Sequence, residues 1–389
     1  MPQLRQPLFL LGGISPQQFM RDYWQKKPLL IRQALPSCAA MLTPDEIFKL
    51  ARREDVESRL VSRTQAAWKI QHGPFTALPR LTRRHWTLLV QGLNLHHMAA
   101  AKIMNLFSFI PDARLDDVMA SYASPGGGVG PHFDSYDVFL LQVKGQREWQ
   151  ISTQSDLSLE EGLPLKILRH FKPQQTWLLE EGDMLYLPPH VAHNGTAVTS
   201  CITCSIGFRA PNYAELTDGF LSHVAETLYE KPDFSRLYAD PQQVAVSKPA
   251  ALPMTMVKEF AAQLRQLRWN TDQISQFLGR YLSEPKPHIF FDPPEPLSTF
   301  AKFKKILCKQ TLALAPASLA LYDRQYFYLN HEETLLTLSP QAETLLPSLA
   351  NRRGWSREEC TILLDDVVLL PQVYEWFSYG WLQWHEEHV

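Results

Sequence analysis

The motif Gly130-Pro131-His132-Phe133-Asp134 constrains this chain more than any other stretch, because strand-like segments and a second histidine motif follow it. On an extended strand, His132 and Asp134 would present both side chains on one face, since they are two residues apart. Two imidazoles and one carboxylate form a facial metal site that suits Fe(II) and leaves positions open. The second imidazole would come from Pro188-Pro189-His190-Val191-Ala192-His193, in which His190 and His193 are alternatives.

The residues around these motifs favour short antiparallel strands. Apolar and β-branched residues fill 136–143, and the turn signal Lys144-Gly145 leads into 147–152, so we expect these two segments to pair as a hairpin. Further strands are expected at 176–179, 184–187 and 199–208. Many short strands separated by turns predict a closed or double-sheet antiparallel architecture, such as a cupin jelly roll.

Helical patterns flank this strand-rich region. Residues 1–115 are expected to be mostly helical, with a capped start at Thr43-Pro-Asp-Glu46 and a helix over 85–103. After Pro211 the apolar residues recur with helical spacing, in segments 213–229 and 254–282. The proline-rich stretch 285–296 indicates a linker, because its prolines resist both helix and sheet. Beyond the linker we expect a small α+β unit, with a hairpin that turns at Asp323-Arg324 and helices over 333–349 and 370–384.

Three motifs together carry a resemblance to a known family: G-P-H-x-D at 130–134, K-G-x-R at 144–147 and G-D-x-L-Y-x-P-P-x-x-x-H at 182–193. They resemble the JmjC-type 2-oxoglutarate oxygenases. Segments 19–31 and 121–131 resemble more closely the bacterial ribosomal oxygenases, which hydroxylate an arginine of ribosomal protein uL16. The resemblance covers essentially the whole chain and is most specific between residues 121 and 208.

The resemblance implies an α+β protein: a double-stranded β-helix (the cupin or JmjC jelly roll) with a helical surround, a helical dimerisation region and a C-terminal winged-helix-like domain. With the boundaries above, residues 1–210 would be the catalytic domain with its N-terminal helices. Residues 211–284 would be the dimerisation region and residues 285–389 the winged-helix-like domain. The long helices with apolar faces are the residue-level reason to expect a homodimer.

The resemblance also implies roles for individual residues. His132, Asp134 and His193 would bind Fe(II), with His193 favoured over His190 because the family's ligand follows the second proline at this distance. Arg147 would hold the far carboxylate of 2-oxoglutarate, since a guanidinium offers that group a two-pronged contact. Lys144 is the alternative for this role, and the Ser121 hydroxyl would also meet the co-substrate. Apart from the resemblance, Tyr136 and Asp137 follow the H-x-D motif closely, and from this position we expect them to contact a cationic substrate side chain.

The implied function is an Fe(II)- and 2-oxoglutarate-dependent protein hydroxylase that uses O2 as second co-substrate and acts on Cβ of an arginine in uL16. One alternative is a related oxygenase that hydroxylates histidine or asparagine, or demethylates lysine. Another is a non-catalytic cupin that binds the ribosome or nucleic acid, which the intact set of His132, Asp134, His193 and Arg147 disfavours.

Composition sets the remaining expectations. The chain has 389 residues, of which 45% are hydrophobic and 20% charged, as in an ordinary folded protein. A net charge of −2 gives no general attraction to nucleic acid, so we expect no direct binding to it. No apolar run is long enough for a transmembrane helix, and we expect a cytoplasmic protein without a membrane partner. Cys201 and Cys204 form a C-x-x-C inside a strand pattern and are expected to be core residues.

Overall fold

The structure is a computed structural model that describes residues 4–64, 67–229, 231–287, 289–296 and 299–385. The chain divides into two compact units, 1–210 and 211–389, and each has a hydrophobic core of its own. The first unit carries the two histidine motifs, so its architecture decides how they meet.

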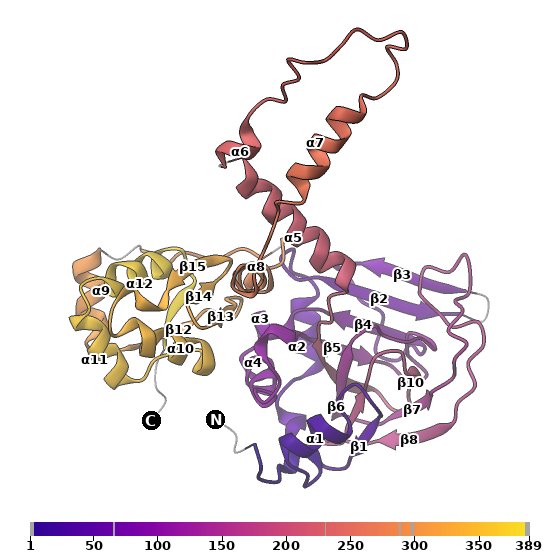
Figure 1. Ribbon diagram of the computed structural model, residues 1–389. Coiled ribbons are helices and arrows are strands. Elements are labelled where there is room, and N and C mark those ends of the chain that lie inside the picture. The colour runs from indigo at the N-terminus through magenta and orange to yellow at the C-terminus, as the bar shows by residue number, and fades with distance from the viewer. Residues whose placement is uncertain (1–3, 65–66, 230, 288, 297–298, 386–389) are drawn as a thin grey trace. The chain divides into compact units, whose positions relative to one another are not determined.

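Two antiparallel sheets form the centre of the first unit (Figure 1). The larger sheet has eight strands, in the order β1 (Leu29–Ile31), β9 (Met184–Leu187), β6 (Asp137–Lys144), β11 (Cys201–Phe208), β5 (Leu115–Ala123), β4 (Trp86–Val90), β2 (Ser58–Arg63) and β3 (Trp68–His72). The smaller sheet has three, in the order β10 (Ala192–Ala197), β7 (Arg147–Ser152) and β8 (Gln175–Leu179). This is the double-sheet β architecture that the strand spacing predicts.

Strand β6 shows why the larger sheet is buried on both faces. Its side chains alternate, so Phe139 and Leu141 enter the core shared with the N-terminal helices. Val138 and Leu140 point the other way, into a second cluster that includes Trp149 of the smaller sheet. A strand that is apolar on both faces therefore separates the helical layer from the interior between the sheets.

Helices of the first unit pack on the outer face of the larger sheet. Thr43 caps helix α2 (Pro44–Leu50) with the reciprocal Thr43–Glu46 capping box that the sequence predicts. Phe19, Ile47 and Ile103 bring these helices into the sheet's core. The helices are α1 (Pro16–Asp22), α2 (Pro44–Leu50), α3 (Leu93–His96) and α4 (Met98–Asn105), with 3-10 turns η1 (Phe9–Leu11), η2 (Cys38–Ala40) and η3 (Asp112–Arg114).

Three expectations for this unit are wrong. Residues 1–115 are not mostly helical, because four strands lie among them, and 85–103 begins with strand β4 instead of a helix. The run Trp86–Val90 is buried along its whole length, which hides the alternation that would have identified it. Segments 136–143 and 147–152 do not pair as a hairpin either. Strand β6 pairs with β9 and β11, whereas β7 pairs with β8 and β10, so the turn at Gly145 crosses between the sheets.

The second unit begins with helices α5 (Tyr213–Leu228), α6 (Pro232–Ser235), α7 (Met254–Leu264) and α8 (Thr271–Ser283). The expected helix over 254–282 is thus interrupted between α7 and α8. Phe220 of α5 packs against Phe277 of α8, with ring centroids 5.4 Å apart. Neither α5 nor α7 contains a buried residue, and several large apolar side chains on them are exposed: Tyr213, Leu221, Met254, Met256, Val257, Phe260 and Leu264.

A compact α+β part completes the second unit. The predicted hairpin is present, because β13 and β14 pair across Asp323, whose N–H donates to Tyr326 O. The described residues between 285 and 296 form neither helix nor strand, as expected of a linker. The elements are α9 (Phe300–Leu307), β12 (Thr311–Leu314), β13 (Ala320–Tyr322), β14 (Tyr326–Leu329), β15 (Glu332–Leu335), η4 (Leu336–Leu338), α10 (Ala342–Arg352), α11 (Arg357–Asp365), α12 (Leu369–Ser378) and β16 (Leu382–His385).

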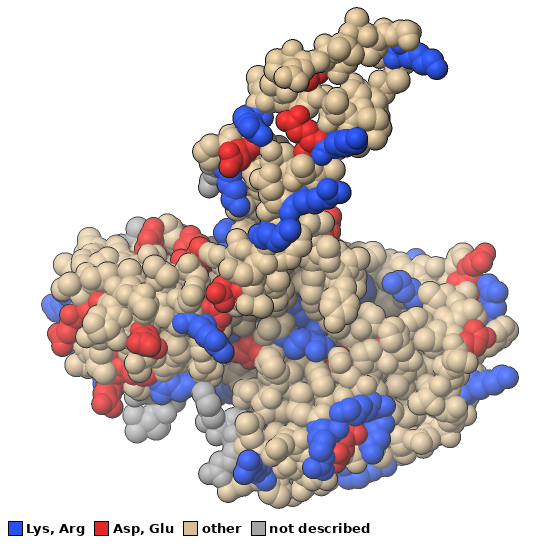
Figure 2. Space-filling model, viewed as in Figure 1, with Lys and Arg blue, Asp and Glu red and all other residues tan. Residues whose placement is uncertain are grey.

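Three global expectations can be compared with the structure. Among the described residues, no helix has the length and apolar content needed to cross a membrane. Cys201 and Cys204 are buried free thiols, as predicted for core residues. On the face shown in Figure 2, lysine and arginine lie interspersed with aspartate and glutamate, in keeping with the small net charge.

Candidate metal centre and its pocket

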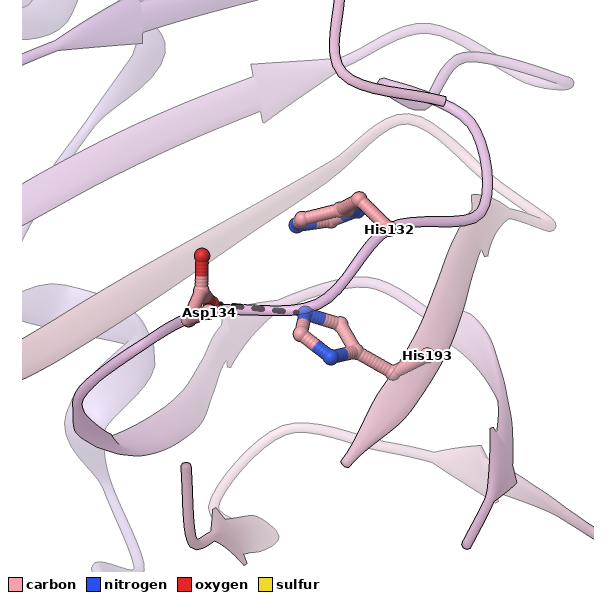
Figure 3. A group of neighbouring side chains, drawn as sticks. All are labelled: His132, Asp134 and His193. Carbon is pink, nitrogen blue, oxygen red and sulfur yellow. Dashed lines mark ion pairs between the residues drawn. The ribbon is translucent and has the colours of Figure 1, made fainter. Parts of the chain in front are cut away.

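The side chains of His132, Asp134 and His193 come together (Figure 3), in a pocket lined by residues of both sheets. One ligand atom from each of the three side chains lies within 4.8 Å of the other two. Nε2 of His193 is 3.6 Å from Oδ2 of Asp134, and the two imidazole centroids are 4.2 Å apart. A metal ion at the centre of such a group would have three protein ligands on one side.

The three residues are held by different kinds of backbone. His193 lies on β10, which pairs with β7 from Ala192 to Ala197. His132 and Asp134 lie on an irregular segment before β6, instead of the regular strand that the sequence suggests. His132 is tied to His193 by two backbone hydrogen bonds, from each N–H to the other residue's carbonyl, at 2.9 and 2.7 Å. This bridge brings the two motifs together.

Hydrogen bonds fix which imidazole nitrogen carries the proton. Nδ1 of His132 lies 2.9 Å from Gly130 O, and Nδ1 of His193 lies 2.9 Å from Val191 O. A carbonyl oxygen can only accept, so Nδ1 is the protonated nitrogen in both rings. The lone pair of each Nε2 is then available toward Asp134, which is the arrangement a metal-binding histidine requires.

Burial makes the charged forms of these side chains costly in the absence of a cation. Burial lowers the pKa of His193 well below its ordinary value, and the nearby His132 lowers it further. Burial also raises the pKa of Asp134, which the charge of His132 opposes. A bound divalent cation would favour a neutral imidazole and an ionised carboxylate together, so the donor set fits Fe(II).

His190, the alternative third ligand, lies outside the cluster. Its backbone has φ +64° at the bend after Pro189, and its side chain is exposed. Its N–H donates to Asp134 O at 2.7 Å, and its ring lies 5.8 Å from that of Phe133. His190 therefore contributes a backbone contact behind Asp134, whereas the imidazole of His193 faces Asp134 directly.

Arg147 lies at the buried end of the same pocket and is 3% exposed. Its Nη1 donates to Ser121 Oγ at 3.1 Å and to Thr203 Oγ1 at 3.3 Å, and its Nη2 donates to Gly195 O at 3.2 Å. No described carboxylate forms an ion pair with it. Lys144, the alternative, is exposed at the end of β6. A buried guanidinium that contacts only neutral groups leaves the pocket with an unbalanced positive charge, suited to a small carboxylate.

Glycine at position 195 is required by the packing around Arg147. A Cβ at this position would lie 2.7 Å from the ring of Trp149 and 2.8 Å from Nε of Arg147. The guanidinium carbon of Arg147 lies 4.8 Å from the centroid of the Trp149 ring. Gly195 thus leaves the space in which Arg147 is held against Trp149, and it lies on β10, the strand that also carries His193.

The structure separates Tyr136 from Asp137. Tyr136 lines the pocket and is 37% exposed. Asp137 is fully buried away from the pocket, where Oδ1 accepts from Tyr186 Oη at 2.6 Å and Oδ2 from Gln25 Nε2 at 2.9 Å. Arg114 completes an ion pair with it at 3.3 Å. The expectation that Asp137 contacts substrate is therefore wrong, because consecutive residues entering a strand point to opposite faces.

Sequence reasoning missed several polar residues that line the pocket, among them Asp116, Asp117 and Thr203. Asp117 accepts from Gln91 Nε2 at 2.7 Å and from Gly92 N at 3.0 Å. Thr203 lies opposite Ser121 in the β11–β5 register, which places both hydroxyls near Arg147. Alternation along 199–208 could have indicated Thr203. Asp117 lies two residues before Met119 and four before Ser121, so the same alternation could have indicated a polar end to that strand face.

Comparison with known proteins agrees with this architecture. A family model described as JmjC domain matches residues 102–216, and one described as ROXA-like winged helix matches residues 266–383. The protein named ribosomal protein uL16 3-hydroxylase of Escherichia coli K12 is 36% identical over 282 residues, which cover 72% of this chain and 74% of that protein. A probable ribosomal oxygenase of Haemophilus influenzae is 42% identical over 216 residues, covering 53% and 52% of the two chains.

Solved structures give the same result. The E. coli ribosomal oxygenase YcfD, in complex with cobalt and 2-oxoglutarate, superposes with a TM-score of 0.80 at 31% sequence identity, over 95% of this chain and 98% of that one. The first unit is thus a JmjC jelly roll, and the second ends in a winged-helix domain. By fold and by sequence, this chain belongs to the JmjC ribosomal oxygenases.

Proposed function

We propose that this protein is an Fe(II)- and 2-oxoglutarate-dependent dioxygenase that hydroxylates Cβ of an arginine in ribosomal protein uL16. The observation that carries the proposal is one pocket with three distinct chemical regions. The His132, Asp134 and His193 side chains converge in it, Arg147 lies at its buried end, and Asp116 and Asp117 line it as well.

His132, Asp134 and His193 would hold the iron through two Nε2 atoms and one carboxylate oxygen. Iron with 2-oxoglutarate and O2 supplies hydroxylation of a C–H bond coupled to oxidative decarboxylation of 2-oxoglutarate to succinate and CO2. The protein's own contribution is placement. The carbonyls of Gly130 and Val191 hold the two imidazoles in one tautomer, so that both Nε2 atoms are available to the metal.

Arg147 would bind the far carboxylate of 2-oxoglutarate. Ser121 and Thr203 hold the guanidinium from one side, and each hydroxyl has a second hydrogen bond within the sheet, to Thr203 O and Gln142 Oε1 respectively. Because these groups are fixed before the co-substrate arrives, little reorganisation is needed on binding. Trp149 covers the guanidinium on one face, which keeps water from competing for it.

The acidic residues of the pocket favour a cationic substrate side chain. Partial burial raises the pKa of Tyr136, and the charges of Asp134, Asp117 and Asp116 raise it further, so the Tyr136 phenol stays protonated in a negative environment. A substrate guanidinium is a permanent cation with a planar set of donors, and it complements carboxylates better than a neutral imidazole or carboxamide does. Asp116 and Asp117 are therefore the residues we assign to recognition of the target arginine.

The choice of uL16 as the source of that arginine rests on the E. coli relative, whose name states this substrate. Hydroxylation of histidine or asparagine, or demethylation of lysine, is the alternative. We also propose a cytoplasmic location, because the enzyme would meet a ribosomal protein substrate there. We further propose that segment 211–284 forms a homodimer, because α5 and α7 expose apolar side chains that no described residue of the chain buries.

Substrate-stimulated turnover tests the proposal. The purified enzyme is supplied with Fe(II), 2-oxoglutarate and O2, and succinate is measured with a uL16 fragment and with the same fragment carrying lysine in place of each arginine in turn. One arginine is expected to be essential for stimulation. Asp117→Asn is expected to weaken stimulation by the peptide more than the basal conversion of 2-oxoglutarate. Equal stimulation by all the lysine-substituted fragments would contradict recognition of arginine.

A further inference from the structure

The two histidines of the metal centre differ in how their backbones are supported. His193 lies within β10, where hydrogen bonds to β7 hold six consecutive residues in register. His132 lies on an irregular segment and is attached to β10 by a single bridge. A metal ligand on irregular backbone requires further contacts if its side chain is to keep one orientation.

Residues 158–169, in the connection between β7 and β8, provide such a contact, and we call this segment the strap. It folds back on itself through hydrogen bonds from Arg169 N to Ser158 O at 2.9 Å and from Glu160 N to Ile167 O at 2.8 Å. Its returning arm then pairs with the segment that carries His132, because Leu168 N donates to Pro131 O at 2.8 Å. The residue directly before His132 is therefore hydrogen-bonded to the strap.

Side chains from two separate segments converge on Gly130. A Cβ on Gly130 would lie 3.1 Å from Cδ1 of Ile167, on the strap, and 3.1 Å from Cζ2 of Trp68, on β3. Gly130 has φ +84°, which a residue with a side chain rarely adopts. Gly130 O is the acceptor for Nδ1 of His132 at 2.9 Å. Ile167 and Trp68 thus confine the peptide whose carbonyl orients the imidazole.

We propose that Ile167 of the strap and Trp68 of β3 are positioning residues for the metal ligand His132. By confining Gly130, they keep its carbonyl directed at Nδ1, so that Nε2 of His132 faces Asp134 and His193. The inference rests on the proposed function, since it assumes that the three side chains bind iron. Groups that orient a metal-binding histidine commonly contribute about tenfold to hundredfold in metal affinity. If these residues only filled the core, their substitution would lower the stability of the fold and leave the metal affinity of the folded protein unchanged.

The test is Co(II) affinity, measured by titration of the folded, metal-free protein and independent of turnover. Ile167→Ala and Trp68→Ala are each expected to weaken Co(II) binding by about tenfold. The double variant is expected to lose Co(II) affinity by a factor smaller than the product of the two single-variant factors, because both side chains act through the same glycine. Ile167→Val and Trp68→Phe are expected to retain most of the affinity. Leu165→Ala, a half-buried apolar residue of the same strap, is the matched control and is expected to keep it.

Unchanged Co(II) affinity in Ile167→Ala and Trp68→Ala, with only a lower unfolding temperature, would overturn the proposal. If either alanine variant fails to fold, the tautomer of His132 is measured instead. The NMR shifts of its ring nitrogens in the unaltered metal-free protein report which nitrogen carries the proton. A proton on Nδ1 is expected, and a proton mainly on Nε2 would contradict the role of Gly130 O. Failure of the unaltered protein to bind Co(II), or equal binding by Asp134→Ala, would refute the metal centre itself and not the strap alone.

Discussion

Oδ2 of Asp134 lies 3.6 Å from Nε2 of His193, although the two residues come from separate segments of the chain. Their proximity depends on the backbone bridge between His132 and His193, which joins the segment before β6 to strand β10. Both side chains lie in surroundings that disfavour their charged forms, because burial lowers the pKa of His193 and raises that of Asp134. A metal ion that both could bind would explain why they are placed together.

Removal of the carboxylate tests this explanation. Asp134→Ala is expected to abolish Fe(II) binding and turnover while the fold survives, because the side chain lines the pocket and is only partly buried. Binding is measured by titration with Co(II) or Fe(II), and folding by circular dichroism. Normal conversion of 2-oxoglutarate to succinate by Asp134→Ala would contradict the assignment.

His193→Ala and His190→Ala form a matched pair. His193→Ala is expected to abolish metal binding, since the His193 imidazole faces Asp134. His190→Ala is expected to cause only a small loss of metal affinity, because His190 contributes its backbone N–H and exposes its side chain. Metal affinity is measured for both variants. A larger loss in His190→Ala than in His193→Ala would reassign the third ligand.

Arg147→Ala is expected to weaken 2-oxoglutarate binding strongly, because loss of one partner from a buried charge pair costs roughly 3–5 kcal/mol. The Michaelis constant for 2-oxoglutarate should therefore rise by orders of magnitude. Lys144→Ala is the control, since this side chain is exposed and is not among the residues that line the pocket. The Michaelis constant of this variant for 2-oxoglutarate should not change. The opposite pattern would show that the carboxylate binds elsewhere.

Asp137→Ala is expected to destabilise the first unit and leave the Michaelis constant of the peptide substrate unchanged. The fully buried carboxylate accepts hydrogen bonds from Tyr186 and Gln25 and pairs with Arg114, so its removal leaves the buried Tyr186 hydroxyl and the half-buried Arg114 without this acceptor. The loss should be about 3 kcal/mol or more, measured by chemical denaturation. Full stability combined with a raised peptide Michaelis constant would restore Asp137 to the substrate site.

The homodimer is tested by sedimentation. The unaltered protein is expected to sediment as a dimer at micromolar concentration, and Phe260→Glu is expected to shift it toward monomer, because Phe260 is an exposed apolar residue of α7. Glu259→Gln, at the adjacent exposed position, is the control and should remain dimeric. A monomer for the unaltered protein would refute the proposal.

The sequence predicts the parts of the site that depend on local spacing. The H-x-D motif selected His132 and Asp134, and the family resemblance selected His193 and Arg147; the structure brings all four into one pocket. Local spacing also predicts the Thr43 capping box and the hairpin at Asp323.

What the sequence could not predict depends on long-range pairing. The turn at Gly145 was expected to close a hairpin, but whether two neighbouring strands pair or enter different sheets is decided by partners far along the chain. The orientation of Asp137 was missed for a related reason, because its partners Gln25, Arg114 and Tyr186 come from three distant segments. Thr203 and the acidic pair at 116–117 acquire their place in the pocket only through the register of β11 with β5.

The most direct test of the whole account is the mass and position of the modification on the substrate. A uL16 fragment incubated with the enzyme, Fe(II), 2-oxoglutarate and O2 is expected to gain one oxygen atom, and to gain none when any one of the three is omitted. Fragmentation is expected to place that oxygen on Cβ of an arginine, because only the C–H bond held beside the metal is in position to react. Oxygen on histidine or asparagine, or loss of a methyl group from lysine, would contradict the arginine assignment. An unchanged mass of the fragment under the complete conditions would contradict the enzymatic function itself.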